Sequence, residues 1–119
     1  MKISVLVVDD NEDLLFLLSR QLEAEGFAVT TCRYGKNFLV QLLKDKPQVV
    51  LLDIAMGSVT GIDLCEEVRS NGQTDSIRIL LMSGNNDIAQ IAQSCRADGY
   101  IRKPLDIHDI KSKIIAVLE

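Results

Sequence analysis

The sequence predicts an α/β fold in which a parallel β-sheet is covered by helices on both faces. Short runs of apolar, mostly β-branched residues alternate five times with segments whose apolar residues recur every three or four positions. The first pattern is typical of buried strands and the second of amphipathic helices. Because the connections between them are short, right-handed crossovers bring all the strands into one sheet.

The composition is that of an ordinary globular domain, 47% hydrophobic and 25% charged, and we expect one domain spanning residues 1–119. A net charge of −4 argues against direct nucleic-acid binding, which needs a basic surface. The N-terminus has no apolar stretch long enough for a signal peptide or a membrane span. We therefore expect a soluble, cytoplasmic protein that does not enter a membrane.

The three cysteines, Cys32, Cys65 and Cys95, form no recognisable metal-binding or disulfide pattern. They are odd in number and far apart, whereas zinc sites and disulfide frameworks use close or paired spacings. Cysteine is also a common small residue of protein interiors. We therefore expect three reduced thiols that pack in the core.

The central strand of the predicted sheet is the segment 49–53, in which four apolar residues run into one carboxylate, Asp53. Such a run, with Pro47 before it and Gly57 after it, is typical of a strand buried on both faces. Its last residue then lies at the carboxyl edge of the sheet, where open α/β folds place their binding sites. The other predicted strands are 3–8, 28–32, 77–82 and 99–101.

Each predicted strand is followed by an amphipathic helix. The first begins after the polar residues 9–11 and ends at Gly26, and the last begins at Asp106, which can cap it. The second is predicted for residues 35–44, and the third ends near Gly72. The residues expected to face the core are Leu14, Leu17, Leu18 and Leu22 in the first helix, Phe38, Leu39, Leu42 and Leu43 in the second, Ile62, Leu64, Cys65 and Val68 in the third, Ile88, Ile91, Ala92 and Cys95 in the fourth, and Ile107, Ile110, Ile114 and Val117 or Leu118 in the fifth.

Four of the predicted strands end in polar residues that a parallel sheet brings to one edge. The first strand ends in Asp9 and Asp10, and the third ends in Asp53. Ser83 follows the fourth strand and Lys103 follows the fifth. Three neighbouring carboxylates repel one another unless a cation joins them. Oxygen ligands of this kind select a hard ion, and we predict Mg²⁺.

The same side chains are suited to receive a phosphoryl group on Asp53. A carboxylate can attack phosphorus in line while nearby positive charges neutralise the transferred group. Lys103 supplies a mobile ammonium group that can pair with a carboxylate or with a phosphoryl oxygen. Ser83 adds a hydroxyl donor. These residues therefore predict a magnesium-assisted phosphoacceptor with Asp53 as the nucleophile.

Across nearly its whole length the sequence resembles the receiver domain of two-component response regulators, the CheY-like family. The residues that carry the resemblance are the pair Asp9–Asp10, Asp53 after a buried strand, Met56 and Gly61 at the expected spacing, Ser83 and Lys103–Pro104. The resemblance implies a flavodoxin-like, doubly wound (βα)5 fold of strand order 2-1-3-4-5, which the alternation alone does not choose. It also implies a regulatory phosphoacceptor, not an enzyme, that assists its own phosphorylation and dephosphorylation.

The resemblance implies a donor, a metal and the ligands of that metal. Asp53 would accept the phosphoryl group from a sensor histidine kinase or a histidine phosphotransfer protein. Asp10 and Asp53 would bind Mg²⁺ directly, Asp9 would assist through water, and the backbone carbonyl of Ala55 would complete the protein ligands. Phe16, on the polar side of the first helix near the acidic pair, is either a kinase contact or a single exposed aromatic residue.

The resemblance also implies how the signal leaves the domain. Ser83 and Lys103 would bind the phosphoryl oxygens, and the Lys103–Pro104 peptide bond would be cis. Ser83 would move toward the phosphoryl group and Tyr100 would swing inward, unless Tyr100 simply packs. The face formed by the fourth helix, fifth strand and fifth helix would then change its affinity for a downstream protein, an effector domain or a second copy.

A few positions depart from the commoner residues of the family or carry no assigned role. Gly57 stands where proline is common, and Ser83 stands where threonine is common. Ala55 and Asn85, two residues beyond Asp53 and Ser83, occupy positions that tune the phosphoryl lifetime in receivers. The single histidine, His108, lies among acids near a helix start, and we assign it no phosphotransfer role.

Three alternatives stay open beside the phosphoacceptor. A pseudo-receiver would keep the fold and act as a phosphorylation-independent interaction module. A flavin or nucleotide site needs a phosphate cradle after the first strand, where residues 9–13 are acidic instead. Phosphohydrolases that form an aspartyl phosphate have a second aspartate where this chain has Ala55.

Both a stand-alone receiver and a piece of a longer regulator fit the sequence, and we favour the second.

Overall fold

The computed structural model describes residues 2–33, 37–56 and 60–119, and it confirms the predicted α/β fold. Five parallel strands form one sheet in the order β2-β1-β3-β4-β5, the flavodoxin-like order. The strands are β1 (Ser4–Val8), β2 (Ala28–Cys32), β3 (Val49–Asp53), β4 (Arg78–Ser83) and β5 (Gly99–Arg102). The helices are α1 (Glu12–Ala24), α2 (Phe38–Asp45), α3 (Gly61–Arg69), α4 (Ile88–Ser94) and α5 (Ile107–Leu118).

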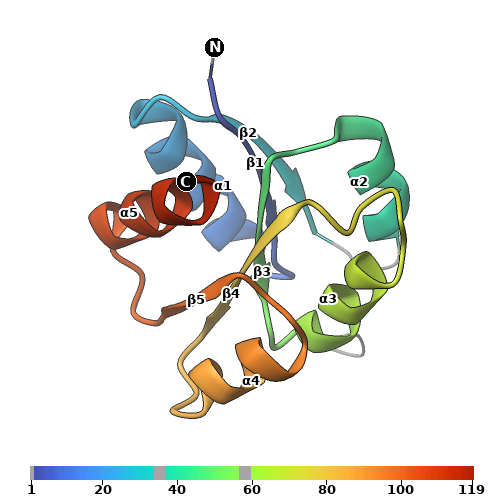
Figure 1. The fold of residues 1–119 in the computed structure, drawn as a ribbon. Helices are drawn as coiled ribbons and strands as arrows, with labels where there is room; N and C mark the ends of the chain where they lie inside the picture. Colours follow the sequence, from blue (N-terminus) through green and yellow to red (C-terminus); the bar gives the residue numbers. More distant parts are fainter. Residues whose placement is uncertain (1, 34–36, 57–59) are drawn as a thin grey trace.

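The helices cover both faces of the sheet, α1 and α5 on one side and α2, α3 and α4 on the other (Figure 1). Side chains of a strand alternate between the two faces. In β3, Val49 and Leu51 pack against α1 and α5, whereas Val50 and Leu52 pack against the other three helices. This double burial is the reason why β3 is a continuous apolar run.

The register of the strands brings their carboxyl ends to one edge of the sheet. Asp53, the last residue of β3, lies beside Met82 of β4, and Ser83 lies beside Arg102 at the end of β5. On the other side of β3, Val8 of β1 lies beside Leu52. The residues that follow β1 and β5 therefore emerge next to the end of β3.

Polar side chains fix where the helices begin at this edge. The Asn11 side chain accepts a hydrogen bond from the Leu14 N–H at 3.1 Å and caps α1. Asp106 accepts from the His108 N–H at 2.8 Å and caps α5, as its position in the sequence predicts. Each cap satisfies an N–H group that has no partner within its helix.

The predicted buried face of the first helix is partly wrong. Leu18 and Leu22 are buried as predicted, but Leu17 is 56% exposed and Leu15 is buried in its place. Leu15, Leu18 and Leu22 follow one helical face at spacings of three and four residues, and Leu17 lies on its flank. Phe16 is 64% exposed, on the polar side as predicted.

Other predicted features agree with the structure where it describes them. The three cysteines are buried, and none of them forms a disulfide within the described residues. No helix within 2–33, 37–56 and 60–119 is long and apolar enough to cross a membrane. The predicted start of the second helix at residue 35, and Gly57, lie outside the described residues.

A cluster of charged groups stabilises the amino edge of the sheet. The Arg69 guanidinium, at the end of α3, donates to the carbonyls of Arg96 at 2.7 Å and Ile77 at 2.8 Å. It also donates to the Asp98 carboxylate at 2.5 Å, and that carboxylate accepts from the Ile79 N–H of β4. These bonds join α3, β4 and the α4–β5 connection at the edge opposite Asp53.

Gly61 allows α3 to start against the backbone that follows β3. Its N–H donates to the Ile54 carbonyl at 2.9 Å. A Cβ at this position would overlap the Asp53 carbonyl oxygen and would lie 2.9 Å from the Ile54 Cα. The close approach therefore requires glycine, and it couples the position of α3 to Asp53.

We predict that Gly61→Ala lowers the free energy of unfolding by about 1–3 kcal/mol, because the new methyl group must displace backbone atoms of Asp53 and Ile54. Urea denaturation measures this difference. Gly72→Ala is the matched control, since a Cβ at Gly72 meets no atom within 4 Å. Equal stability of the two variants would contradict the packing described for Gly61.

Candidate functional site

The predicted acidic residues come together at the carboxyl edge of the sheet. Asp9 and Asp10 directly follow β1, and Asp53 ends β3. One carboxylate oxygen from each residue lies within 4.8 Å of the others. Asp9 and Asp53 are 1% and 4% exposed, whereas Asp10 is exposed at the surface. The cluster therefore has two buried carboxylates and one that faces solvent.

Lys103 joins this cluster from the residue after β5. Its Nζ lies 3.4 Å from Asp53 Oδ1, which also accepts from the Ala55 N–H at 3.4 Å. The backbone N–H of Lys103 donates to the Ser83 carbonyl at 2.9 Å, which fixes the lysine beside β4. The Lys103–Pro104 peptide bond is cis, the form that the family resemblance implies.

Asp9 is electrostatically the most perturbed carboxylate of the cluster. Burial, and secondarily the negative charge of Asp53, raise the pKa of Asp9 from 3.8 to about 6. The Asn11 N–H, which donates to Asp9 Oδ1 at 2.9 Å, and the Lys103 charge oppose this rise. Asp9 Oδ2 is buried and accepts no hydrogen bond from any described residue.

This donor set fits a hard divalent cation. Carboxylate oxygens are the ligands that Mg²⁺ prefers, and the three acids supply more negative charge than Lys103 can neutralise. The buried Asp9 Oδ2 is an acceptor that a cation or its water would satisfy. The residues present are therefore compatible with Mg²⁺ at Asp9, Asp10 and Asp53, with the Ala55 carbonyl as a further predicted ligand.

Ser83 and Asn85 form a turn at the end of β4. The Ser83 hydroxyl oxygen accepts from the Asn85 N–H at 2.9 Å, and the Asn85 side chain accepts from the Asp87 N–H at 2.8 Å. The Ser83 side chain is partly exposed, and its hydroxyl proton is not used by the Asn85 contact. Ser83 can therefore donate to a group that enters beside Asp53.

An apolar hollow of about 360 Å³ lies beside the cluster, and the sequence analysis did not find it. It is lined on one side by Leu14 and Leu17 of α1, and on the other by Lys103, Pro104 and Leu105. Phe16, for which the sequence left open either a kinase contact or a single exposed aromatic residue, lines a different hollow against β2. The feature that would have indicated this hollow is Leu17, an apolar residue on the flank of α1 that faces outward.

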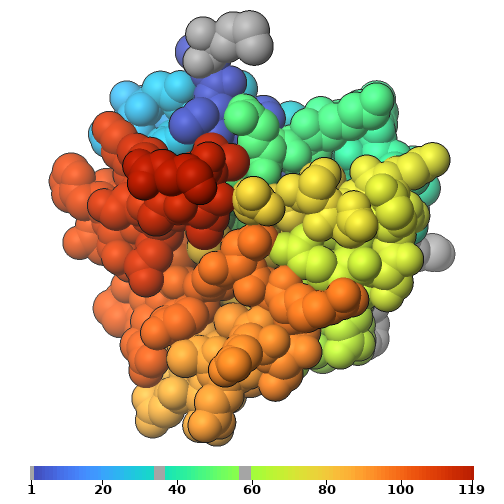
Figure 2. Space-filling model, in the orientation of Figure 1, coloured from blue at the N-terminus to red at the C-terminus, as the bar shows by residue number. Residues whose placement is uncertain are grey.

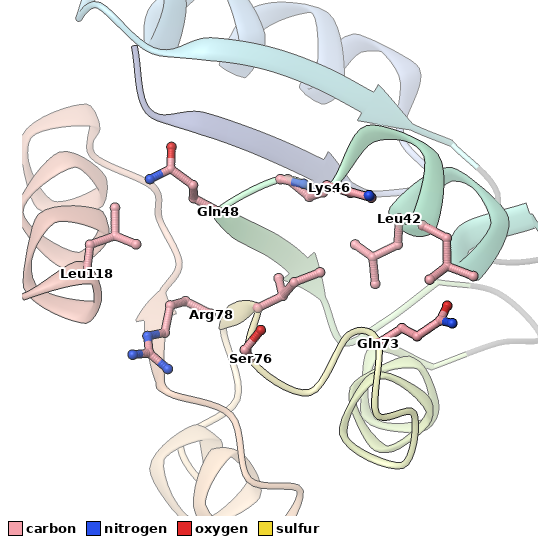
Figure 3. Close-up of a pocket in the computed structure, with 10 residues that line it drawn as sticks. Leu42, Lys46, Gln48, Gln73, Ser76, Arg78 and Leu118 are labelled. Carbon is pink, nitrogen blue, oxygen red and sulfur yellow. The ribbon is translucent and has the colours of Figure 1, made fainter. Parts of the chain in front are cut away.

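A wider hollow, of about 850 Å³, lies at the amino edge of the sheet, where Gln48 precedes β3 and Arg78 begins β4 (Figure 3). Its cationic side chains, Lys46 and Arg78, extend in different directions. Arg78 is also engaged elsewhere, since its Nε donates to the Val117 carbonyl at 2.9 Å. We place the functional site at the acidic cluster, where the polar groups converge, although the hollows there are smaller.

Comparison with known proteins identifies the family. A family model described as the response regulator receiver domain matches residues 5–115. This chain is a member of the response regulator receiver family. It is therefore the regulatory receiver domain of a two-component system, a class of domain that interacts with histidine kinases and with effector domains.

Curated relatives and solved structures agree with this assignment. The receiver domain is 30% identical over 116 residues to the phosphate regulon transcriptional regulatory protein PhoB of Rhizobium meliloti, covering 96% of this chain and 51% of PhoB. It is 28% identical to the alkaline phosphatase synthesis transcriptional regulatory protein PhoP of Bacillus subtilis, covering 99% of this chain and 49% of PhoP. The chain therefore spans about half the length of these relatives.

Two solved structures show the same fold over essentially the whole receiver domain. A signal receiver domain from Bermanella marisrubri is 26% identical with a TM-score of 0.90, and the match covers 100% of both chains. The chemotaxis protein CheY4 of Vibrio cholerae is 24% identical with a TM-score of 0.90, covering 98% of this chain and 99% of CheY4. The CheY-like fold is thus shown independently of the family model.

We predict that Asp9→Asn raises the free energy of unfolding by about 1–3 kcal/mol at pH 7 without divalent cations. The substitution removes a buried carboxylate whose pKa is raised from 3.8 to about 6. The contribution of Asp9 to wild-type stability should be fully present below pH 3.8 and should be lost as the pH rises through 6, since the folded state holds this proton more tightly. Thermal unfolding in EDTA at pH 7 and pH 4 measures the difference.

The expected gain is much smaller at pH 4, where Asp9 is protonated in the folded wild-type domain. Asp45→Asn is the matched control, because it removes one negative charge from an exposed position on α2. A gain that is equal at both pH values, or equal for the two variants, would contradict the assignment of the effect to the burial of Asp9.

Proposed function

We propose that this receiver domain accepts a phosphoryl group on Asp53 from a phosphohistidine donor, either a sensor histidine kinase or a histidine phosphotransfer protein. The observation that supports this most strongly is the convergence of Asp9, Asp10 and Lys103 on the Asp53 carboxylate. The Lys103 ammonium group lies 3.4 Å from that carboxylate, and the three acids could bind a metal ion as a second positive charge. Positioning and charge neutralisation are the main requirements of phosphoryl transfer.

In the proposed transfer, Asp53 Oδ2 forms the new bond to phosphorus. Oδ1 is the oxygen that accepts from the Ala55 N–H and lies next to Lys103 Nζ, so these contacts hold the carboxylate in one orientation. The phosphorus–nitrogen bond of the donor breaks, and the histidine nitrogen leaves with the electron pair. Lys103 and the Ser83 hydroxyl then neutralise and bind the phosphoryl oxygens.

Asp9, Asp10, Asp53 and the Ala55 carbonyl would hold Mg²⁺, which neutralises charge on the phosphoryl group when it is bound. This arrangement makes the domain a phosphoacceptor that assists its own phosphorylation and dephosphorylation. The burial of Asp9 beside Asp53 supports a need for Mg²⁺, because burial and the neighbouring negative charge raise the pKa of Asp9, and a cation would offset both effects. A pseudo-receiver, the alternative, would not need two buried carboxylates, because it binds no phosphoryl group.

The transferred phosphoryl group would change the positions of Ser83 and Tyr100. A phosphoryl group adds roughly two negative charges and new acceptor oxygens beside Ser83. Ser83 would move toward them, and Tyr100 of β5 would turn inward. The face formed by α4, β5 and α5 would then bind a downstream protein, an effector domain or a second copy of the receiver. The domain itself would make no direct contact with nucleic acid.

Intact mass after incubation with acetyl phosphate tests the phosphoacceptor. We expect one phosphoryl adduct that requires Mg²⁺ and is lost in Asp53→Ala. Asp63→Ala, which removes an exposed carboxylate on α3, should keep the adduct and serves as the control. A folded wild-type domain that forms no adduct and is not stabilised by Mg²⁺ would overturn this proposal and favour the pseudo-receiver.

The donor protein would dock on the apolar hollow between α1 and the segment that follows β5. Leu17 and Pro104 form opposite sides of this hollow, and Lys103 lines it next to Asp53. A donor seated there would have its phosphohistidine within reach of the acceptor carboxylate. Phe16 remains a second candidate contact, on the hollow that faces β2.

We predict that Leu17→Ala lowers the kcat/KM of phosphotransfer from a phosphorylated kinase about tenfold, the effect of losing one well-buried interface side chain. The donor is any sensor kinase that phosphorylates the wild-type domain. The rate with acetyl phosphate, which needs no docking surface, should not change. Val40→Ala, an exposed apolar residue on α2, is the control.

Measuring Phe16→Ala in the same assay shows which of the two hollows the donor protein contacts. A loss confined to Leu17→Ala assigns docking to the side of α1 that faces Pro104, and a loss confined to Phe16→Ala assigns it to the side that faces β2. Equal slowing with acetyl phosphate would instead show that a variant had damaged the acceptor site.

A further inference from the structure

The connection between α3 and β4 contains the dipeptide Asn71–Gly72, which the proposed phosphoacceptor does not use. In the space-filling view this connection, in yellow, lies at the surface of the molecule (Figure 2). Asn71 is half-buried and Gly72 is exposed. A Cβ at Gly72 would meet no atom within 4 Å. The peptide bond between the two residues is therefore accessible to water.

An asparagine that precedes a glycine can be converted to an acid without an enzyme. The glycine nitrogen gives up its proton to water and attacks the side-chain amide carbon, the side-chain nitrogen leaves as ammonia, and a cyclic succinimide remains. Water then opens this ring at either carbonyl, which gives aspartate or isoaspartate. Glycine favours the attack because it has no Cβ to crowd the nitrogen or restrict the backbone. In a folded protein the rate depends on how the turn holds the reacting atoms.

Hydrogen bonds hold the two reacting atoms within one turn. Asn71 Oδ1 accepts from the Gln73 N–H at 2.9 Å. This bond closes a ring of atoms that contains both the Asn71 Cγ and the Gly72 nitrogen, so the side-chain amide stays beside the peptide bond that attacks it. The Gly72 N–H donates to no acceptor among the residues that the structure describes, so no hydrogen bond must break before the reaction.

The same turn polarises both carbonyl groups of Asn71. The backbone carbonyl oxygen accepts from the Asp75 N–H at 2.9 Å, from the Thr74 N–H at 3.0 Å and from the Thr74 hydroxyl at 3.3 Å. These donors draw electron density from the peptide unit, which makes the Gly72 N–H more acidic. The Gln73 N–H meets Oδ1, the atom on which negative charge develops during the attack. Because Thr74 is 1% exposed, its donors are fixed in place.

We propose that Asn71 is a site of spontaneous covalent modification, at which the folded domain forms isoaspartate and aspartate with water as the only other reactant. The turn promotes the first step, because it holds the side-chain amide beside the Gly72 nitrogen and places donors on both carbonyl oxygens. The reaction uses no residue of the acidic cluster, so it is independent of the proposed function.

Asn85 provides a comparison within the same chain. Its Oδ1 accepts from the Asp87 N–H at 2.8 Å, the same type of turn bond that Asn71 makes. The residue that follows it is Asn86, whose side chain crowds the nitrogen that would attack. We therefore expect the reaction at Asn71 and not at Asn85.

Isoaspartate at this position would weaken the connection between α3 and β4. The link to Gly72 would run through the former side-chain carbon, so the main chain would be longer by the Cβ atom. The carbonyl that accepts from Thr74 and Asp75 would become a carboxylate outside the main chain. The Arg69 guanidinium holds the rest of the connection, donating to the carbonyls of Asp75 at 3.1 Å and Ile77 at 2.8 Å. We expect the isoaspartate form to unfold at a lower urea concentration than the unmodified domain.

Incubation of the purified domain at mildly alkaline pH, followed by peptide mapping with mass spectrometry, tests this proposal. An isoaspartyl methyltransferase, which methylates the free α-carboxylate of isoaspartate, identifies that product. We expect conversion at Asn71, at least as fast in the folded domain as in the same domain unfolded in urea. Gly72→Ala should slow it at least about tenfold, equivalent to about 1.4 kcal/mol of activation free energy. This variant keeps the fold, because the added Cβ meets no atom within 4 Å.

Three results would each overturn the proposed modification site. They are slower conversion in the folded domain than in urea, a rate that Gly72→Ala leaves unchanged, and conversion at Asn85 with Asn71 intact. The isoaspartate form is also separated by ion exchange, and its unfolding in urea is compared with that of unmodified domain from the same incubation. Equal unfolding midpoints would overturn the proposed weakening of the connection between α3 and β4.

Discussion

The burial of the Asp9 carboxylate beside Asp53 is the constraint on which the rest of the structure depends. Both carboxylates are nearly inaccessible to solvent, and burial, followed by the negative charge of Asp53, raises the pKa of Asp9. Lys103 offsets one negative charge at 3.4 Å, and an oxygen atom of Asp9 remains without a hydrogen-bond partner among the described residues. The arrangement stores an unfavourable interaction that additional positive charge relieves, which is the property expected of a site that binds a cation and then a phosphoryl group.

The remainder of the fold holds these groups in place. The core on both faces of β3 fixes Asp53 at the end of a rigid strand, and the close contact at Gly61 fixes the start of α3 against it. The Arg69–Asp98 cluster joins the opposite edge of the sheet.

Much of this architecture could be predicted from the sequence, because apolar periodicity and polar strand ends report on local structure directly. The strand order could not be derived in that way, since alternation of strands and helices is compatible with several orders. Leu17 was wrongly expected in the core, because a run of leucines near Leu18 fits two adjacent helical faces. The contact of Tyr100 with Lys113 joins residues of different elements, and sequence spacing carries no signal for such a pair.

The most direct test of the central claim is to locate the phosphoryl group chemically. Borohydride reduction converts an aspartyl phosphate to homoserine, and peptide mapping by mass spectrometry then identifies the residue. After treatment with acetyl phosphate and Mg²⁺, the account predicts homoserine at position 53 and at neither of the other two acids of the cluster. Homoserine at Asp9 or Asp10 with Asp53 unmodified would contradict it, because the buried carboxylate at the end of β3 would then not be the acceptor.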